Sequence, residues 1–219
     1  ARPGGVGRNI AHDLRLLGVN VSLVTAVGGD VYGQGILDSC RELGIDMSLA
    51  RILPERRSST YLYVTDETGD MQIGIADMEI TECITPEYLA SRMDEINAFD
   101  AVVLDANLSA ESVEYAARHC TAPIIADPVS TAKAMRLVPV LDKLWAIKPN
   151  IYEAEKLTGE HDPEKAAAAL LDKGVKRVFI SLGEEGMLAA ERGSTVHMPR
   201  ELVTVVNTTG AGDAATSAI

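Results

Sequence analysis

The strongest chemical signal in the chain is a glycine-rich segment that precedes a predicted helix. Residues 207–213 read NTTGAGD and lead into small helix-forming residues. Two glycines let the backbone approach an anion closely, and the N–H groups at the start of a helix favour negative charge. Asp213, in the first turn, can accept a proton from a hydroxyl that attacks a bound phosphate. The pattern predicts phosphoryl transfer, with Gly210, Ala211 and Gly212 as an anion hole and Asp213 as the base.

The same segment is compatible with two other interpretations. A glycine turn followed by an aspartate in the first helical turn is common in α/β proteins. Gly210, Gly212 and Ala215 also fit the G-x-G-x-x-A pattern of dinucleotide-binding folds. That pattern normally opens the fold and requires an acidic residue ~20 positions later, where this chain has ended. The chain contains no Gly-Lys pair, so a P-loop is absent.

A second glycine turn stands at the other end of the chain. Gly4 and Gly5 precede a predicted helix that carries Asn9. Exposed backbone together with the Asn9 amide can bind sugar hydroxyls, although a helix-opening turn without a ligand has the same composition.

Three further segments place polar residues where predicted strands end. Asn150 and Glu153 fit a capping box, or they order water around a magnesium ion bound to nucleotide phosphates. Residues 181–186 form either a tight turn or a backbone surface for a nucleotide. Asp105 and Asp127 each end a predicted strand, at the edge of an α/β sheet where ligands bind, or they cap helices.

The elements that must position these residues alternate between short β-branched runs and stretches with helical spacing, which predicts an α/β fold with a mainly parallel sheet. Gly18, Gly44 and Gly174 stand where three helices should stop. The predicted strands are Val21–Val27, Ala101–Asp105, Ile124–Asp127, Leu144–Lys148 and Arg177–Leu182. The predicted helices are Arg8–Leu17, Gln34–Leu43, Pro86–Met93, Ala110–His119, Tyr152–Leu157 and Pro163–Lys173.

One segment departs from this alternation. Ser58–Thr65 and Met71–Ile75 have the period of strands and are joined by the turn-forming sequence DETGD. The pattern predicts a hairpin, which is either a plain edge hairpin or a flap that closes over a ligand.

Composition limits the classes of function. The 219 residues carry a net charge of −12, which argues against binding nucleic acid. No apolar run approaches the ~18 residues of a membrane span, and no signal peptide is visible, so we expect a soluble cytoplasmic protein. The three cysteines and four histidines show no ligand spacing, so any metal should be a hard ion on oxygen.

The ends of the chain lead to one more expectation. Ala1 stands directly before a glycine turn with no strand ahead of it, and Ile219 is predicted to lie inside a helix. We therefore expect one domain over residues 1–219 that is truncated at both ends.

Together these motifs resemble the ribokinase-like (PfkB) family of sugar and nucleoside kinases, nearly from end to end. The likeness includes Gly28–Gly33 (GGDVYG) and the flap strands as well as the segments above. Residues 3–11, 76–78 with 84–89, and 127–130 are most similar to the bacterial members that phosphorylate pseudouridine. The resemblance implies a three-layer α/β/α fold with a small β lid, to which residues 58–76 contribute.

The resemblance also implies a reaction and a site. The reaction is ATP- and magnesium-dependent phosphorylation of the ribose 5′-hydroxyl of pseudouridine. Asp213 matches the general base, and Gly210, Ala211 and Gly212 match the anion hole. The sugar-binding turn of the family is matched by Gly4, Gly5 and Asn9. The nucleotide-binding residues of the family are matched by Asn150, Ser181, Gly183 and Gly186. The position of Glu153 implies a residue that binds magnesium indirectly, through water.

Several alternatives stay open at this point. The acceptor can be ribose, a fructose phosphate or adenosine instead, because the shared motifs bind the sugar. The family usually has Asp where this chain has Asn207, in a segment that often helps to bind potassium. An exposed apolar flap face would favour a homodimer through the lid. A dinucleotide-binding oxidoreductase and a binding module without catalysis are the other two classes.

Overall fold

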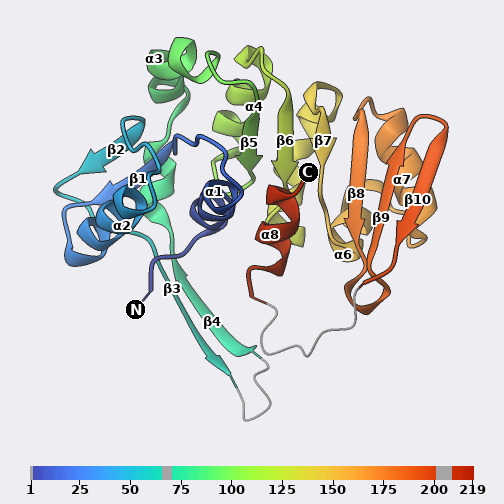
Figure 1. Ribbon diagram of the computed structural model, residues 1–219, viewed down its shortest axis with the longest axis horizontal. Coiled ribbons are helices and arrows are strands. Elements are labelled where there is room, and N and C mark those ends of the chain that lie inside the picture. The colour runs from blue at the N-terminus through green and yellow to red at the C-terminus, as the bar shows by residue number, and fades with distance from the viewer. Residues whose placement is uncertain (1, 66–70, 201–208) are drawn as a thin grey trace. The chain divides into compact units, whose positions relative to one another are not determined.

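The computed structural model describes residues 2–65, 71–200 and 209–219 (Figure 1). These residues cluster into two compact units. The first unit contains residues 2–85 and 209–217, and the second contains residues 86–200 with 218 and 219. The predicted flap turn at 66–70, the β-like run at 202–206 and Asn207 lie outside the described residues.

The first unit contains two small sheets. Strands β1 and β2 pair in parallel, and β3 and β4 pair antiparallel, which confirms the predicted hairpin. The predicted strand at 21–27 is shorter, because Ser22 makes only an isolated bridge with Asp46. The elements are α1 (Val6–Leu16), β1 (Thr25–Gly28), α2 (Val31–Glu42), β2 (Ala50–Leu53), β3 (Thr60–Thr65), β4 (Met71–Asp77), the 3₁₀ helix η1 (Glu79–Cys83) and α8 (Ala211–Ser217). Helix α8 ends at Ser217, so the prediction that Ile219 lies inside a helix is wrong.

The carboxylate of Asp30 organises the turn between β1 and α2. It accepts hydrogen bonds from the Gly33 N–H (2.8 Å), the Ser58 hydroxyl (2.7 Å) and the Ser58 N–H (2.8 Å). The buried Ser58 hydroxyl accepts in turn from the Gly28 N–H at 3.0 Å. The same carboxylate therefore caps α2 and fixes the chain two residues before β3.

Close packing explains why this turn requires glycine. A Cβ atom at Gly33 would lie 2.1 Å from the Gly28 carbonyl oxygen, and one at Gly28 would lie 2.3 Å from the Arg56 carbonyl oxygen. Both distances are far shorter than a van der Waals contact. The GGDVYG segment is thus a packed structural turn.

The second unit is built on a six-stranded sheet with the order β10-β9-β8-β7-β6-β5. The pairs from β5 to β8 are parallel, and β9 and β10 are antiparallel additions. The strands are β5 (Val102–Asp105), β6 (Ile124–Asp127), β7 (Ala146–Ile147), β8 (Arg177–Ser181), β9 (Met187–Glu191) and β10 (Ser194–Met198). The mainly parallel sheet confirms the predicted fold class.

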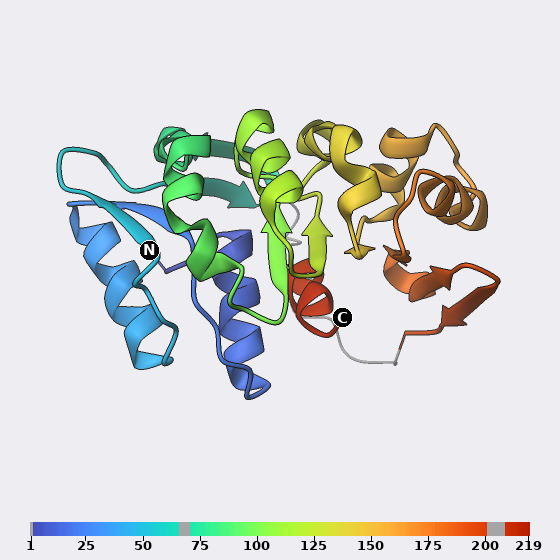
Figure 2. The same ribbon diagram turned by 90° about the horizontal axis from the view of Figure 1, so that it is seen from above.

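The helices of this unit, from α3 to α7, lie over one face of its sheet (Figure 2). They are α3 (Pro86–Ile96), α4 (Ala110–His119), α5 (Thr131–Ala134), the 3₁₀ helix η2 (Met135–Lys143), α6 (Ile151–Thr158) and α7 (Pro163–Asp172), with a short 3₁₀ turn η3 (Gly183–Glu185) before β9. Every predicted helix is present. Helix η2 was not predicted, and Pro139 inside it lacks the N–H that an α-helix would use.

Asp30→Asn should destabilise the first unit. Asparagine retains an acceptor for the cap but directs an NH₂ group against the Ser58 N–H, so we expect a loss of about 1–2 kcal/mol in the free energy of unfolding. The Ser58 hydroxyl first, and then the N–H groups of Gly33 and Ser58, hold the pKa of Asp30 below its ordinary value. The stabilisation is therefore complete above the ordinary carboxyl pKa and is lost as the pH falls through the lower folded-state pKa.

Urea unfolding of both proteins at neutral and acid pH tests this expectation. The difference between them should narrow below about pH 4. Asp38→Asn is the control, because Asp38 forms an exposed ion pair with Arg41 and should change stability by less than about 0.5 kcal/mol. Equal stability of Asp30→Asn and the wild type at neutral pH would contradict the role given to Asp30.

Candidate functional site

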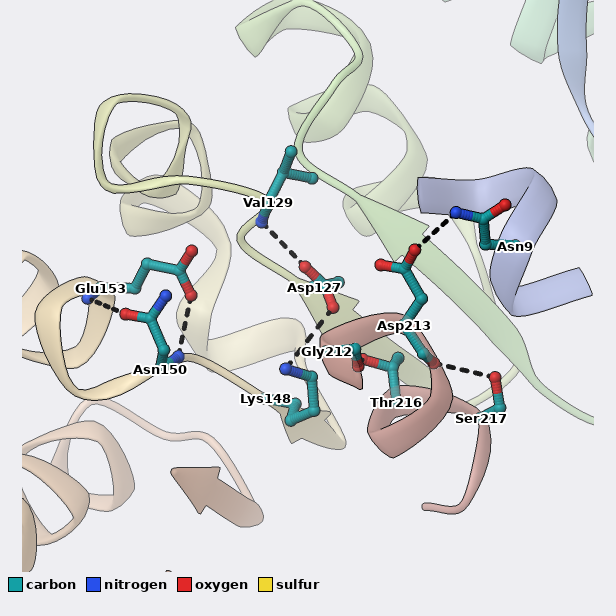
Figure 3. A network of polar contacts seen from close by, with 10 residues as sticks. All are labelled: Asn9, Asp127, Val129, Lys148, Asn150, Glu153, Gly212, Asp213, Thr216 and Ser217. Atoms are coloured by element: carbon teal, nitrogen blue, oxygen red, sulfur yellow. Dashed lines mark hydrogen bonds and ion pairs between the residues drawn. The ribbon is translucent and has the colours of Figure 1, made fainter. Parts of the chain in front are cut away.

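In the first unit, Asn9 of α1 and Asp213 of α8 face each other (Figure 3). The Asn9 Nδ2 donates a hydrogen bond to the Asp213 Oδ2 at 2.8 Å, although 204 positions separate the two residues in the sequence. Each side chain lies near the start of its helix, after a glycine at positive φ: Gly5 at 99° and Gly210 at 85°. The structure thus brings together the two glycine motifs from opposite ends of the chain.

Packing between α1 and α8 fixes the turn that carries Asp213. Ile10 on α1 and Thr216 and Ser217 on α8 are all buried. The Ser217 hydroxyl lies 2.9 Å from the Asp213 carbonyl oxygen and 3.4 Å from the Ile10 carbonyl oxygen. The Asp213 carboxylate is therefore set by contacts on its backbone as well as by Asn9.

The backbone at both glycine turns is open. A Cβ atom at Gly4, Gly5 or Gly210 would meet no heavy atom within 4 Å beyond its immediate neighbours in the chain. Positive φ at Gly5 and Gly210 disfavours any other residue, and the protein leaves the space above these residues unfilled. Such turns fit the close approach of a sugar or a phosphate group.

In the second unit, charged residues gather at the carboxyl ends of β5, β6 and β7. Asp105 is paired with Asp127 in the register of β5 and β6. The buried Asp127 accepts a hydrogen bond from the Val129 N–H at 2.8 Å, and its Oδ2 lies 3.8 Å from the Nζ of the buried Lys148. Burial, and then the nearby Asp127 carboxylate, raise the pKa of Asp105.

The predicted capping box is present. The Asn150 Oδ1 accepts from the Glu153 N–H at 2.9 Å, and the Glu153 Oε2 accepts from the Asn150 N–H at 2.8 Å (Figure 3). Glu153 is buried, and this burial raises the pKa of its carboxyl although the Asn150 N–H opposes the shift. The interpretation of Asn150 and Glu153 as a capping box is therefore confirmed. The charges of Asp127 and Lys148 both affect the pKa of the buried Glu153 carboxyl: Asp127 raises it and Lys148 lowers it.

The turn after β8 meets this capping box. Asn150 and Ser181 form a parallel bridge, and the Ser181 N–H donates to the Pro149 carbonyl oxygen at 3.0 Å. Gly186 has φ 91°, and a Cβ atom there would lie 2.1 Å from the Met198 carbonyl oxygen, so packing within the chain requires glycine. Gly183 has φ 62° and open space above it. The predicted tight turn is confirmed, and its open glycine lies two residues after Ser181.

Sequence reasoning did not single out Lys148. The residue follows four positions that are mostly apolar and buried, Leu144–Ile147, and is itself only 3% exposed. A lysine at the end of a buried strand was the available signal, because lysine is rarely buried without a partner.

Within the described residues, no group of three or more His, Cys, Asp or Glu side chains is arranged to hold a metal ion. None of the helices in these residues is long and apolar enough to span a membrane.

Comparison with known protein families identifies the family of this chain. The pfkB family carbohydrate kinase profile matches residues 1–219. The chain belongs to the PfkB family of carbohydrate kinases. Members of this family are ATP-using sugar or nucleoside kinases. The resemblance that the motifs predicted is thereby confirmed at the level of the family.

Individual relatives refine the comparison. The chain is 37% identical to pseudouridine kinase from Escherichia coli (strain K12), over 97% of this chain and 70% of that protein. It is similar to a carbohydrate kinase structure from Agrobacterium tumefaciens (TM-score 0.84, 29% identity, 98% of this chain and 70% of that one). It is also similar to ribokinase from Thermotoga maritima (TM-score 0.88, 26% identity, 99% of this chain and 74% of that one). The fold is therefore ribokinase-like.

Proposed function

We propose that this PfkB chain is part of an ATP-dependent kinase that phosphorylates the ribose 5′-hydroxyl of pseudouridine. The observation that carries the proposal is the hydrogen bond between Asn9 and Asp213, which joins a sugar-binding turn to a candidate base. The 37% identity to a pseudouridine kinase supports the choice of acceptor. Membership of a kinase family favours this reading over a dinucleotide-binding oxidoreductase or a binding module without catalysis.

In this proposal Asp213 is the general base. The 5′-hydroxyl gives its proton to the Asp213 carboxylate as its oxygen bonds to the γ-phosphorus of ATP, and the bond from that phosphorus to ADP breaks. The backbone N–H groups of Gly210, Ala211 and Gly212 stabilise the charge on the transferring group. Asn9, with Gly4 and Gly5, binds the sugar and holds the Asp213 carboxylate in place.

The proposed nucleotide side lies in the second unit. Asn150, Ser181, Gly183 and Gly186 surround it, and Glu153 orients water on a magnesium ion. Magnesium, when bound, would neutralise phosphate charge. The residues fit this ion, because magnesium prefers oxygen ligands and is commonly held by one or two carboxylates, water and substrate phosphates. Potassium activation stays a prediction, since Asn207 lies outside the described residues.

The hairpin within residues 58–76 is proposed to contribute a lid that excludes water from the transfer. One of its faces is apolar and exposed. Leu62 pairs with Ile75 and Val64 pairs with Ile73, so all four side chains lie on the same face. They are 60–67% exposed. A second copy of the chain is the partner we propose for this face, because a two-stranded sheet is only marginally stable by itself.

The acceptor is tested by magnesium-dependent ADP release from ATP. Pseudouridine, uridine, adenosine, ribose and fructose 6-phosphate are offered separately, with potassium or sodium as the monovalent ion. Turnover with pseudouridine well above all others is the expected result. Turnover only with another acceptor would contradict pseudouridine as the substrate but would agree with a kinase activity. No turnover together with no ATP binding would contradict the proposed function.

Replacing the base separates chemistry from binding. Asp213→Asn keeps the shape of the side chain but cannot accept the proton, so turnover should fall by ~10² or more while affinities for ATP and acceptor stay nearly unchanged. Steady-state kinetics with calorimetric binding measures both. Asp38→Asn is the surface control. Unchanged turnover in Asp213→Asn would remove this residue from the mechanism.

The proposed dimer is tested by a substitution that places a charged side chain on the apolar face of the hairpin. Ile75→Asp should shift the protein from dimer to monomer in sedimentation equilibrium, because it buries a charge in an apolar contact. Ala76→Asp introduces the same charge on the opposite face and should leave the dimer intact. A wild-type monomer at all concentrations, or equal effects of both variants, would contradict the proposed contact.

A further inference from the structure

Ser59, the residue directly before β3, has a buried hydroxyl group without a hydrogen-bond partner. Among the described residues, two buried side-chain polar atoms have no partner, the Arg8 Nε and the Ser59 Oγ. Arg8 still donates from Nη2 to the Ser39 hydroxyl at 2.8 Å, so its guanidinium group is partly satisfied. The Ser59 hydroxyl has no such second bond. An unsatisfied buried hydroxyl is destabilising, and in a folded protein it requires an explanation.

Helices α1 and α2 begin at the same end of the first unit. Arg8, near the start of α1, contacts Ser39 on α2. Arg15, in the last turn of α1, donates from Nε to the carbonyl oxygen of Leu43, the C-cap of α2, at 3.2 Å. Because these contacts follow the same order along both helices, the two helices run in the same direction and their first turns lie on the same side.

This side of the unit carries both the candidate sugar site and Ser59. In α1 it presents Asn9, whose amide holds the Asp213 carboxylate. At the start of α2, Asp30 accepts hydrogen bonds from the N–H and the hydroxyl of Ser58, at 2.8 and 2.7 Å. The next residue along the chain is Ser59. The unpartnered hydroxyl is therefore fixed at the end of the unit where the proposed nucleoside binds.

The hairpin presents two different faces. Side chains alternate along a strand, so Ser59 shares the face of Tyr61, whereas Ser58 is directed toward Asp30 on the opposite side. Tyr61 is 52% exposed and is paired with Ala76 of β4. A hydroxyl group, an aromatic ring and a small side chain thus share this face. Such a combination suits a flat ring with polar groups at its edge, such as a nucleobase.

We propose that the Ser59 hydroxyl binds the base of the nucleoside, by accepting a hydrogen bond from the N1–H group of pseudouridine. The inference rests on the proposed function, because it assumes that the nucleoside binds beside Asn9 and Asp213. In pseudouridine the ribose is attached to carbon, so N1 carries a hydrogen. In uridine N1 is bonded to the ribose, and a C–H group takes the corresponding place on the ring. A ligand that leaves a buried polar group unpaired is discriminated against, which makes Ser59 a specificity-determining residue.

Titration calorimetry with pseudouridine, uridine and N1-methylpseudouridine tests this contact. Ser59→Ala should weaken pseudouridine binding by about tenfold and change uridine binding by less than about threefold, because only pseudouridine loses a hydrogen bond. The preference for pseudouridine over N1-methylpseudouridine should narrow as well, since the variant and the methyl group remove the same bond. Ser59→Thr keeps a hydroxyl and should recover part of the loss. Ser91→Ala is the control, because it removes an exposed hydroxyl that bonds to the Tyr88 carbonyl oxygen, and it should change none of the affinities.

Thermal unfolding without ligand separates a binding role from a structural one. Ser59→Ala removes a buried hydroxyl that has no partner, so its Tm should equal or exceed that of the wild type. Ser58→Ala removes the bonds of the neighbouring hydroxyl to Asp30 and Gly28, so its Tm should be lower. A clear fall in the Tm of Ser59→Ala would show that this hydroxyl supports the fold, and would overturn the inference.

The binding results also distinguish the inference from the proposed function. A wild type that binds pseudouridine, with the same preference over uridine as Ser59→Ala, overturns the role of Ser59 and leaves the proposed function intact. A wild type that binds none of the three nucleosides overturns both.

Discussion

Strand β6 is hydrogen-bonded in parallel register to a neighbour on each side, and that register places three charged residues at one edge of the sheet. Asp105 is level with Asp127, the Ala106 N–H donates to the Asp127 carbonyl oxygen, and the Lys148 N–H donates to the Ala126 carbonyl oxygen. Side chains alternate along a strand, so a shift of one residue would turn each of these groups to the other face. The contact between Lys148 and Asp127 thus depends on backbone pairing that buried Ile124, Ile125 and Ile147 enforce.

A different constraint acts in the first unit, where the candidate base stands on a short helix. Helix α8 has seven residues, too few to be stable by itself in water. Its stability must come from packing, and the buried Ser217 lies against α1, with its hydroxyl 3.4 Å from the Ile10 carbonyl oxygen. The position of Asp213 is consequently a tertiary property, set by a helix that lies at the other end of the sequence.

These constraints explain how much could be predicted from the sequence. Strands β5, β6 and β8 and all six predicted helices follow from local signals: buried apolar runs, helical spacing, and glycines at positive φ after α1, α2 and α7. Strand β2 was missed, because its four residues have no regular apolar alternation and, among the described strands, it pairs with β1 alone. The Asp30–Ser58 contacts were also missed, because 28 residues separate the partners and each is an ordinary turn residue by itself.

The candidate site divides in the same way. Asn150 and Glu153 were predictable as a pair because a capping box is a local motif with fixed spacing. Their proximity to Ser181 was not, since it arises from an isolated parallel bridge between Asn150, which precedes α6, and the last residue of β8. Lys148 and Val129, whose φ is 67°, belong to no sequence motif. Only the folded chain shows that the Lys148 ammonium group and the Val129 N–H both interact with the Asp127 carboxylate.

In the proposed function, Glu153 combines its observed role in the capping box with a role toward magnesium. Its Oε2 accepts the Asn150 N–H, which uses one of about four acceptor positions on a carboxylate. Burial raises the pKa of this carboxyl, so its charged form is disfavoured in the protein alone. A cation nearby favours the charged form and so opposes the effect of burial. The cap fixes the carboxylate beforehand, so little conformational entropy is lost when the ion and its water arrive. A buried capping glutamate is in this sense better suited to orient a magnesium-bound water than an exposed one that must first be ordered.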